Sequence, residues 1–152
     1  MPLNKSFAGR EYPASPPFEV TVEAIREFAD AIGDDNPLYR DENAAKQAGY
    51  PAILAPPTYL TKLNSVYGPQ ILADPALGLN YALVVHGEQD YEYERPVQVG
   101  DVLIAKPRIA SIDAKGKNEL LVTEAIIETQ GGEKVAIARS TIVSRGTAAR
   151  EE

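Results

Sequence analysis

The first half of the chain carries hydrophobic residues at the spacing of short helices. After the proline-rich stretch 13–17, Thr21 can act as the N-cap of a helix, and Gly33 can end it in the left-handed conformation. The apolar positions that recur at helical spacing between them are Val22, Ile25, Phe28, Ala29 and Ile32. The turn 34–37 ends in proline, so the pattern predicts that the helix stops before it.

Two further helices are predicted before residue 70. Asp41 resembles the N-cap of a short helix that runs to Ala48 and is closed by Gly49. Another helical pattern follows Pro56-Pro57-Thr58 and continues to Gly68, with apolar positions at Leu60, Leu63 and Val66. Proline is tolerated in a first helical turn because the N–H that it lacks would be unpaired there.

The second half of the chain is patterned as β-strands. Strands are predicted at 81–95, 102–112, 120–129 and 134–143. In the first, charged residues alternate with Gln89, Tyr91 and Tyr93, as expected of a strand with one solvated face. Turns are expected at 114–117 and at Gly131-Gly132, the second as a two-residue hairpin.

An antiparallel meander of three or more strands preceded by one central helix predicts an α+β fold. The absence of a linker or an internal repeat indicates one domain over residues 1–152, with a frayed polar tail at 145–152. Because such a sheet leaves an edge to be covered, we expect a homodimer or a heterodimer.

Composition excludes several classes of protein. The chain has 152 residues, no Cys and a single His, His86, which removes thiol nucleophiles and two-His metal motifs, so no metal is expected. The net charge of −7 and the lack of a basic run argue against binding to nucleic acid or an anionic membrane. No apolar segment resembles a signal peptide or a membrane span, so we expect a cytoplasmic protein.

The segment from Gly33 to Asp41 is the strongest candidate for chemistry. It places two carboxylates, Asp34 and Asp35, in an irregular turn at the end of an apolar helix, where a pocket can reach them. The alternative is that these residues and Asn36 only form an Asx turn and a helix C-cap.

The order of this turn, a short helix and the segment Ile53-Leu54-Ala55-Pro56-Pro57-Thr58 resembles the MaoC-like hydratase/dehydratase branch of the hot-dog fold. Three later stretches resemble the sheet of the same family: Val85-His86-Gly87-Glu88-Gln89, Arg95-Pro96 and Val99-Gly100-Asp101-Val102-Leu103. The resemblance covers about residues 18–143 and is strongest to the N-terminal dehydratase-like subunits of heteromeric 3-hydroxyacyl-thioester dehydratases. It implies an antiparallel sheet wrapped around a central helix.

The resemblance also implies a reaction. Fully active members have a turn Asp-x-Asn-Pro-Leu-His and a His-Gly pair at the start of the central helix. Their Asp and His hold the water and move the proton in reversible hydration of a trans-2-enoyl thioester, and the Gly amide helps to bind the thioester oxygen. A helix N-terminus suits the enolate-like charge that forms there. The substrate is a thioester of coenzyme A or of an acyl carrier, and no cofactor is required.

Two departures from the family pattern affect this chemistry. The chain keeps Asp34 and Asn36 but has Tyr39 in place of the His, and ionising a phenol of pKa near 10 at neutral pH costs roughly 4 kcal/mol. Ala55-Pro56 replaces the His-Gly pair, and Pro56 has no N–H to donate. Losing one such donor typically costs about a hundredfold to a thousandfold in rate.

Three hypotheses follow for function. The first is a substrate-holding subunit of a dehydratase in fatty-acid metabolism that binds a thioester through Asn36, Ala55, Pro56 and Thr58, while a MaoC-like partner supplies most of the catalysis. The second is a self-sufficient enoyl-CoA hydratase that uses Asp34 with Tyr39 or His86, although His86 can equally be a structural residue near a dimer seam. The third is a non-catalytic module that binds acyl thioesters. A cationic rim for the anionic carrier is guessed at Lys62, Lys106, Arg108 and Lys115.

Overall fold

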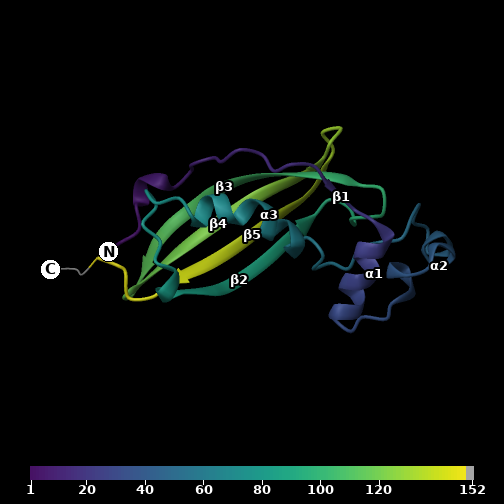
Figure 1. Ribbon diagram of the computed structural model, residues 1–152, viewed down its shortest axis with the longest axis horizontal. Helices are drawn as coiled ribbons and strands as arrows, with labels where there is room; N and C mark the ends of the chain where they lie inside the picture. The colour runs from purple at the N-terminus through teal and green to yellow at the C-terminus, as the bar shows by residue number, and fades with distance from the viewer. Residues whose placement is uncertain (150–152) are drawn as a thin grey trace.

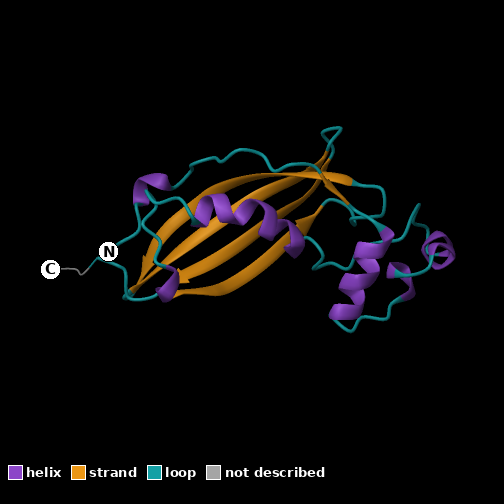
Figure 2. Ribbon diagram, in the orientation of Figure 1, coloured by secondary structure: helices purple, strands orange, loops and turns teal. Residues whose placement is uncertain are grey.

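The computed structural model describes residues 1–149 and consists of one curved sheet with short helices (Figure 2). The helices, in chain order, are η1 (Lys5–Phe7), α1 (Val22–Ala31), η2 (Pro37–Tyr39), α2 (Glu42–Gln47), α3 (Thr61–Leu72) and η3 (Tyr81–Leu83). The strands are β1 (Phe18–Glu19), β2 (Val84–Tyr93), β3 (Val102–Lys115), β4 (Asn118–Thr129) and β5 (Lys134–Ser144).

The sheet is antiparallel throughout and has the strand order β1-β3-β4-β5-β2. Strands β3, β4 and β5 form the predicted meander, whereas β2 crosses to the far edge and pairs with β5. The sheet curves around α3, and α1 and α2 lie together beyond one end of it (Figure 1). The predicted α+β hot-dog architecture, a sheet wrapped around a central helix, is therefore confirmed.

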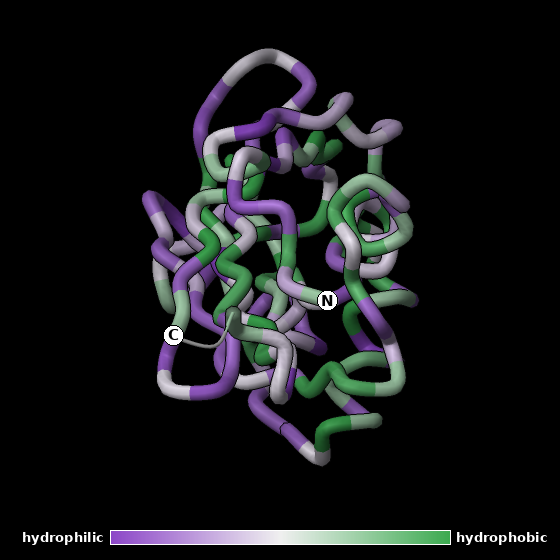
Figure 3. Tube along the Cα trace, turned by 90° about the vertical axis from the view of Figure 1, so that its left-hand side faces the viewer, coloured by the Kyte–Doolittle hydropathy of each residue, from purple (hydrophilic) through white to green (hydrophobic). Residues whose placement is uncertain are grey.

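The side of α3 that faces the sheet is hydrophobic. Leu63, Tyr67 and Ile71 recur at intervals of four residues, which places them on one helix face, and all three are buried. Along β4 buried positions alternate with more exposed ones, as period-two patterning requires. Hydrophobic stretches accordingly gather toward the middle of the molecule, and the outer turns are mostly hydrophilic (Figure 3).

The structure corrects the predicted end of the central helix. Helix α3 does not stop at Gly68 but continues through Pro69 to Leu72. A proline ring normally clashes with the Cβ of the preceding residue in the helical conformation. Gly68 has no Cβ, so it can stay helical before Pro69. Val66, predicted as an apolar contact, is instead 39% exposed.

Three details of the strands and their connections were also wrong. Residues 81–83 form a 3-10 turn instead of the start of a strand, and β1 was not predicted because it is only two residues long. The β4–β5 connection is a four-residue loop, 130–133, instead of the predicted two-residue hairpin. A hydrogen bond from the Thr129 N–H to the Glu133 carbonyl, 2.8 Å long, closes this loop. Gly132 supplies the positive φ, +92°, that this loop requires.

The predicted frayed tail is anchored at its beginning. Thr147 is 6% exposed, and its hydroxyl donates to Oε2 of the fully buried Glu119 at 2.7 Å. The same carboxylate oxygen accepts the Leu3 N–H at 2.9 Å, so Glu119 joins both ends of the chain to β4. Fraying from Arg145 onward is therefore wrong for this part, and 150–152 lie outside the described residues.

We expect the change Thr147→Val to lower the free energy of unfolding by about 1–3 kcal/mol, because it removes a hydrogen bond from a buried carboxylate. The matched control Thr147→Ser keeps the hydroxyl and should lose much less. Chemical denaturation of the three proteins measures the difference. Equal stability of Thr147→Val and the unmodified chain would contradict the role assigned to Glu119.

Candidate functional site

The end of α1 fixes the backbone position of Asp34. Gly33 adopts φ +69° and donates its N–H to the Asp30 carbonyl at 3.1 Å, while Asp34 N–H reaches the Ala29 carbonyl at 2.9 Å. These two bonds make a Schellman motif, which only a residue tolerant of the left-handed conformation can close. The predicted glycine stop is confirmed, and it directs the chain into the candidate turn.

The turn after Asp34 is held by its own side chains. Asp34 Oδ1 accepts the Asn36 N–H at 3.0 Å, and Asn36 Oδ1 accepts the Leu38 N–H at 3.0 Å and so caps η2. Arg40 donates to the Asp34 carbonyl at 2.7 Å and to Asp30 Oδ1 at 2.6 Å. The Asx-turn and capping roles are therefore real, and they occupy Asn36 Oδ1 and one carboxylate oxygen of Asp34.

Tyr39 lies buried beside Asp34. Its side chain is 9% exposed and belongs to the main hydrophobic cluster. Burial raises the pKa of the Tyr39 phenol above its ordinary value of 10.0, and the negative charge of Asp34 raises this pKa further. Tyr39 is thus protonated at neutral pH. It can donate a hydrogen bond but cannot serve as the base that the family's His provides.

The segment before α3 lies against the Asp34–Tyr39 turn. Leu54 N–H donates to the Leu38 carbonyl at 3.0 Å, so the two motif segments are neighbours. Ala55 N–H donates to the Val97 carbonyl at 2.8 Å and is not available to a substrate. The two following residues, Pro56 and Pro57, have no N–H.

Thr58 therefore carries the first backbone donor after the prolines. Among residues 1–149, nothing accepts a hydrogen bond from its N–H. Thr58 is exposed and lies three residues before α3 begins at Thr61. A donor in that place can meet a partial negative charge on a bound group.

A large cavity opens where α1, α3 and β2 meet. Its volume is about 600 Å³, within the range of small-molecule sites. We call it the outer cavity; it is lined by Phe28, Ile32, Pro57, Thr58, Thr61, Gln89, Asp90, Tyr91 and Tyr93. Ile32 is 48% exposed at the end of α1, which leaves apolar surface for a ligand to cover.

Tyr91 brings an unpaired polar group to the outer cavity. Its hydroxyl oxygen is buried and has no hydrogen-bond partner among the described residues. Burial raises the pKa of the Tyr91 phenol, and the nearby Thr61 hydroxyl partly offsets this. An unpaired buried hydroxyl is costly, so a ligand oxygen that paired with it would gain affinity, but only after the side chains that cover this hydroxyl moved. Tyr91 and Gln89 were missed as site residues because the strand pattern shows only which residues share a face.

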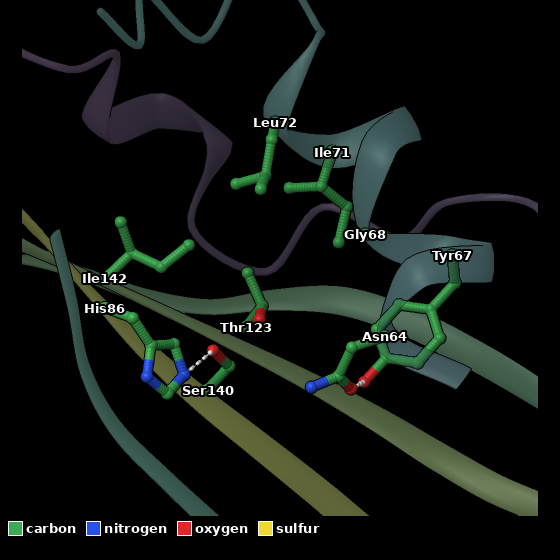
Figure 4. Close-up of a pocket in the computed structure, with 9 residues that line it drawn as sticks. All are labelled: Asn64, Tyr67, Gly68, Ile71, Leu72, His86, Thr123, Ser140 and Ile142. Carbon is green, nitrogen blue, oxygen red and sulfur yellow. Dashed lines mark hydrogen bonds between the residues drawn. The ribbon is translucent and has the colours of Figure 1, made fainter. Parts of the chain in front are cut away.

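Within one chain, His86 lies near the opposite end of β2 from Tyr91 and Tyr93, which line the outer cavity. His86 lies near the start of β2 and bonds Ser140 Oγ through Nε2 at 3.1 Å. Tyr93, whose hydroxyl donates to the Pro57 carbonyl, is seven residues farther along the strand. At ~3.3 Å per residue, His86 therefore lies roughly 23 Å from Tyr93 along β2. His86 instead lines a second cavity beneath α3 (Figure 4).

None of the four residues of the expected cationic rim lines the outer cavity, although Lys62 follows Thr61, which does. Lys62 is on α3, with Nζ 5.6 Å from the centre of the Tyr59 ring. Lys106 and Arg108 are on β3 and pair with Glu128 and Glu124. Lys115 ends β3 at the hairpin.

Arg95 has a structural role. It pairs with Asp101 at 2.9 Å and with Glu133 at 2.8 Å, and these carboxylates hold its pKa above the ordinary value. The Asp101 carboxylate also accepts the Gln98 N–H at 3.0 Å. The ion pair therefore braces the 95–101 loop whose Val97 carbonyl takes the Ala55 N–H.

Within residues 1–149, no group of three or more acidic or histidine side chains could hold a metal ion. Helices of the described part are also too short and polar to cross a membrane.

The raised pKa of Tyr39 predicts a measurable pH dependence. The difference between spectroscopic titrations of the unmodified chain and of Tyr39→Phe isolates the Tyr39 phenol, and its midpoint should lie above pH 10. The change Asp34→Asn should lower this midpoint, because the carboxylate charge disfavours the phenolate. Protonated Tyr39 stabilises the fold fully below pH 10, and this contribution is lost as the pH rises through the folded-state pKa. A midpoint at or below pH 10 would contradict the assigned environment.

The chain is similar to known proteins over most of its length. The family model of the FAS1-like dehydratase domain region matches residues 6–138. A UPF0336 protein from Saccharopolyspora erythraea is 50% identical over 148 residues, 97% of this chain and 95% of that protein.

Two solved structures are also similar. The C-terminally truncated HadBC (3R-hydroxyacyl-ACP dehydratase) complex from Mycobacterium tuberculosis is 31% identical, with TM-score 0.79, over 92% of this chain and 99% of that chain. A MaoC-like dehydratase is 25% identical, with TM-score 0.86, over 93% of this chain and 43% of that chain. The chain belongs to the FAS1-like dehydratase region family and has the hot-dog fold of MaoC-like dehydratases.

Proposed function

We propose that this chain is the substrate-holding subunit of an (R)-3-hydroxyacyl-thioester dehydratase of fatty-acid metabolism, and that a MaoC-like partner supplies most of the catalysis. The observation that carries the proposal is a cavity of substrate size that Ile32 lines at the end of α1, two residues before a turn that has lost its base. Asp34 remains, but its neighbour Tyr39 is a buried phenol with a raised pKa. A site that binds without an effective base holds a substrate better than it converts one.

The small number of free backbone N–H donors before α3 also supports a division between binding by this chain and catalysis by its partner. Ala55 N–H is occupied by Val97, and Pro56 and Pro57 have none. The thioester oxygen would instead meet the Thr58 N–H, and the Tyr91 hydroxyl once the side chains that cover it moved; both residues line the outer cavity. Two neutral donors bind a carbonyl oxygen well enough to position it. The reaction requires no cofactor besides the thioester carrier itself.

The partner would pair with the open edge of the sheet. Strand β2 has 10 residues and a neighbour, β5, on one side only. Val85 is 41% exposed on it, and Tyr81, just before it, is 60% exposed. A long edge strand with exposed apolar side chains favours pairing with another chain. The similar HadBC structure is a complex, which supports a heterodimer, although a second copy of this chain could pair at the same edge.

The complex with a MaoC-like chain that retains both Asp and His tests the division of labour. We expect it to hydrate crotonyl-CoA, and replacing the partner's Asp by Asn to lower kcat by at least about a hundredfold. The change Tyr39→Phe in this chain keeps the ring but removes the hydroxyl, and should alter kcat by less than about threefold if that phenol moves no proton.

Three results would overturn the proposal. Turnover by the isolated chain at the rate of the complex, abolished by Asp34→Asn, would make it a self-sufficient hydratase. A complex no faster than the partner alone would remove the subunit role. Acyl-thioester binding with no effect of any partner would leave a simple binding module.

A further inference from the structure

Beneath α3 lies a second cavity that the proposed reaction does not use. It has a volume of about 160 Å³, and we call it the inner cavity. It is lined by Asn64, Tyr67, Gly68, Ile71, Leu72, His86, Thr123, Ser140 and Ile142. In Figure 4 the α3 residues Ile71 and Leu72 lie on one side, Ile142 and Thr123 on the other, and the Tyr67–Asn64 pair at one end.

One hydrogen bond joins the walls of the two cavities. Asn64 Nδ2 donates to Gln89 Oε1 at 3.0 Å, yet Asn64 lines the inner cavity and Gln89 the outer one. The bonded pair therefore stands between the two spaces. It connects α3 to the edge strand β2 at this point.

Each side chain of the Asn64–Gln89 pair also makes a second hydrogen bond that holds it in place. Tyr67 donates its hydroxyl to Asn64 Oδ1 at 2.5 Å, and Gln89 Nε2 donates to the Arg139 carbonyl at 2.7 Å. The bond between them uses one remaining donor and one remaining acceptor. A side chain that moved would break two hydrogen bonds together, so the pair resists opening.

The inner cavity suits an apolar occupant. Of its polar residues, His86 and Ser140 hydrogen-bond each other at 3.1 Å and so need no polar ligand; His86 is exposed, so this end of the cavity opens to solvent. An apolar protein cavity of about 150 Å³ accommodates benzene, so a cavity of this size has room for about six carbons. An acyl chain that passed the Asn64–Gln89 pair would find a site for its distal end.

We propose that the Asn64–Gln89 pair is an acyl-chain-length filter that confines the acyl group of a bound thioester to the outer cavity. The inference rests on the proposed function, because it takes the outer cavity as the thioester site. In the unmodified chain the carbons beyond the filter stay outside the inner cavity. Removing the Asn64 side chain joins the two cavities and lets a longer chain extend beneath α3.

Calorimetric binding of two saturated thioesters, butyryl-CoA and decanoyl-CoA, tests the filter without requiring turnover. The unmodified chain should bind both within about threefold, whereas Asn64→Ala should bind decanoyl-CoA at least about tenfold tighter than butyryl-CoA, because each buried methylene adds about fourfold. Asn64→Leu has a similar volume and cannot hydrogen-bond, so it should remain closed. Ser65→Ala, on the exposed side of α3, is the matched control.

The outcomes separate the two proposals. Binding of butyryl-CoA with the same chain-length preference in all four proteins overturns the filter and leaves the proposed function standing. A tenfold preference for decanoyl-CoA in the unmodified chain also overturns it. No binding of either thioester by any of the proteins overturns both proposals. If thermal unfolding shows that Asn64→Ala does not fold, Gln89→Ala opens the same partition from β2 and replaces it.

Discussion

The backbone at the start of α3 is the constraint on which the candidate site depends. Residues 53–55 are fixed between two other segments, because Leu54 donates to Leu38 and Ala55 donates to Val97. Behind them the Arg95–Asp101 ion pair holds the loop that carries Val97. The two prolines that follow have no N–H, so the backbone offers no donor between Ala55 and Thr58, three residues before α3 begins at Thr61. The segment is therefore rigid, well positioned and poor in donors, which suits holding a substrate more than activating it.

The same arrangement explains how one fold can divide binding from chemistry. Hydration of an enoyl thioester requires a base near the β carbon and donors near the thioester oxygen. This chain keeps Asp34 in a well-defined turn but surrounds Tyr39 with apolar side chains that keep its phenol neutral. The outer cavity, which Thr58 lines but Asp34 and Tyr39 do not, has the size and the apolar surface to hold a substrate. The Asn64–Gln89 pair then adds selectivity by length, a property of binding alone.

Much of the fold could be predicted from the sequence because its signals are local. Thr21 and Asp41 cap helices, Gly33 ends α1 with positive φ, and the alternation along β2 separates its two faces. Non-local choices could not be predicted. No residue of β2 indicates that it pairs with β5, and the long-range contacts that anchor the tail, such as that of Thr147 with Glu119, leave no signal in the sequence.

The candidate site also has residues that local motifs predict and residues that only the folded structure brings together. Asp34, Asn36, Tyr39, Ala55, Pro56 and Thr58 occur in two short motifs, and the structure brings these motifs together. His86 lies on the same strand as Tyr91, so the sequence could not show that it faces a different cavity. The partition between the cavities was also hidden, because Asn64 and Gln89 meet only when α3 lies against the sheet.

Equilibrium dialysis of the isolated chain against crotonyl-CoA, followed by identification of the bound thioester, tests the central claim most directly. The account predicts saturable binding in which the recovered ligand is still crotonyl-CoA after many hours at high protein concentration. Conversion to 3-hydroxybutyryl-CoA at a rate proportional to protein, and lost in Asp34→Asn, would show that this chain is a catalyst in its own right and would contradict the account.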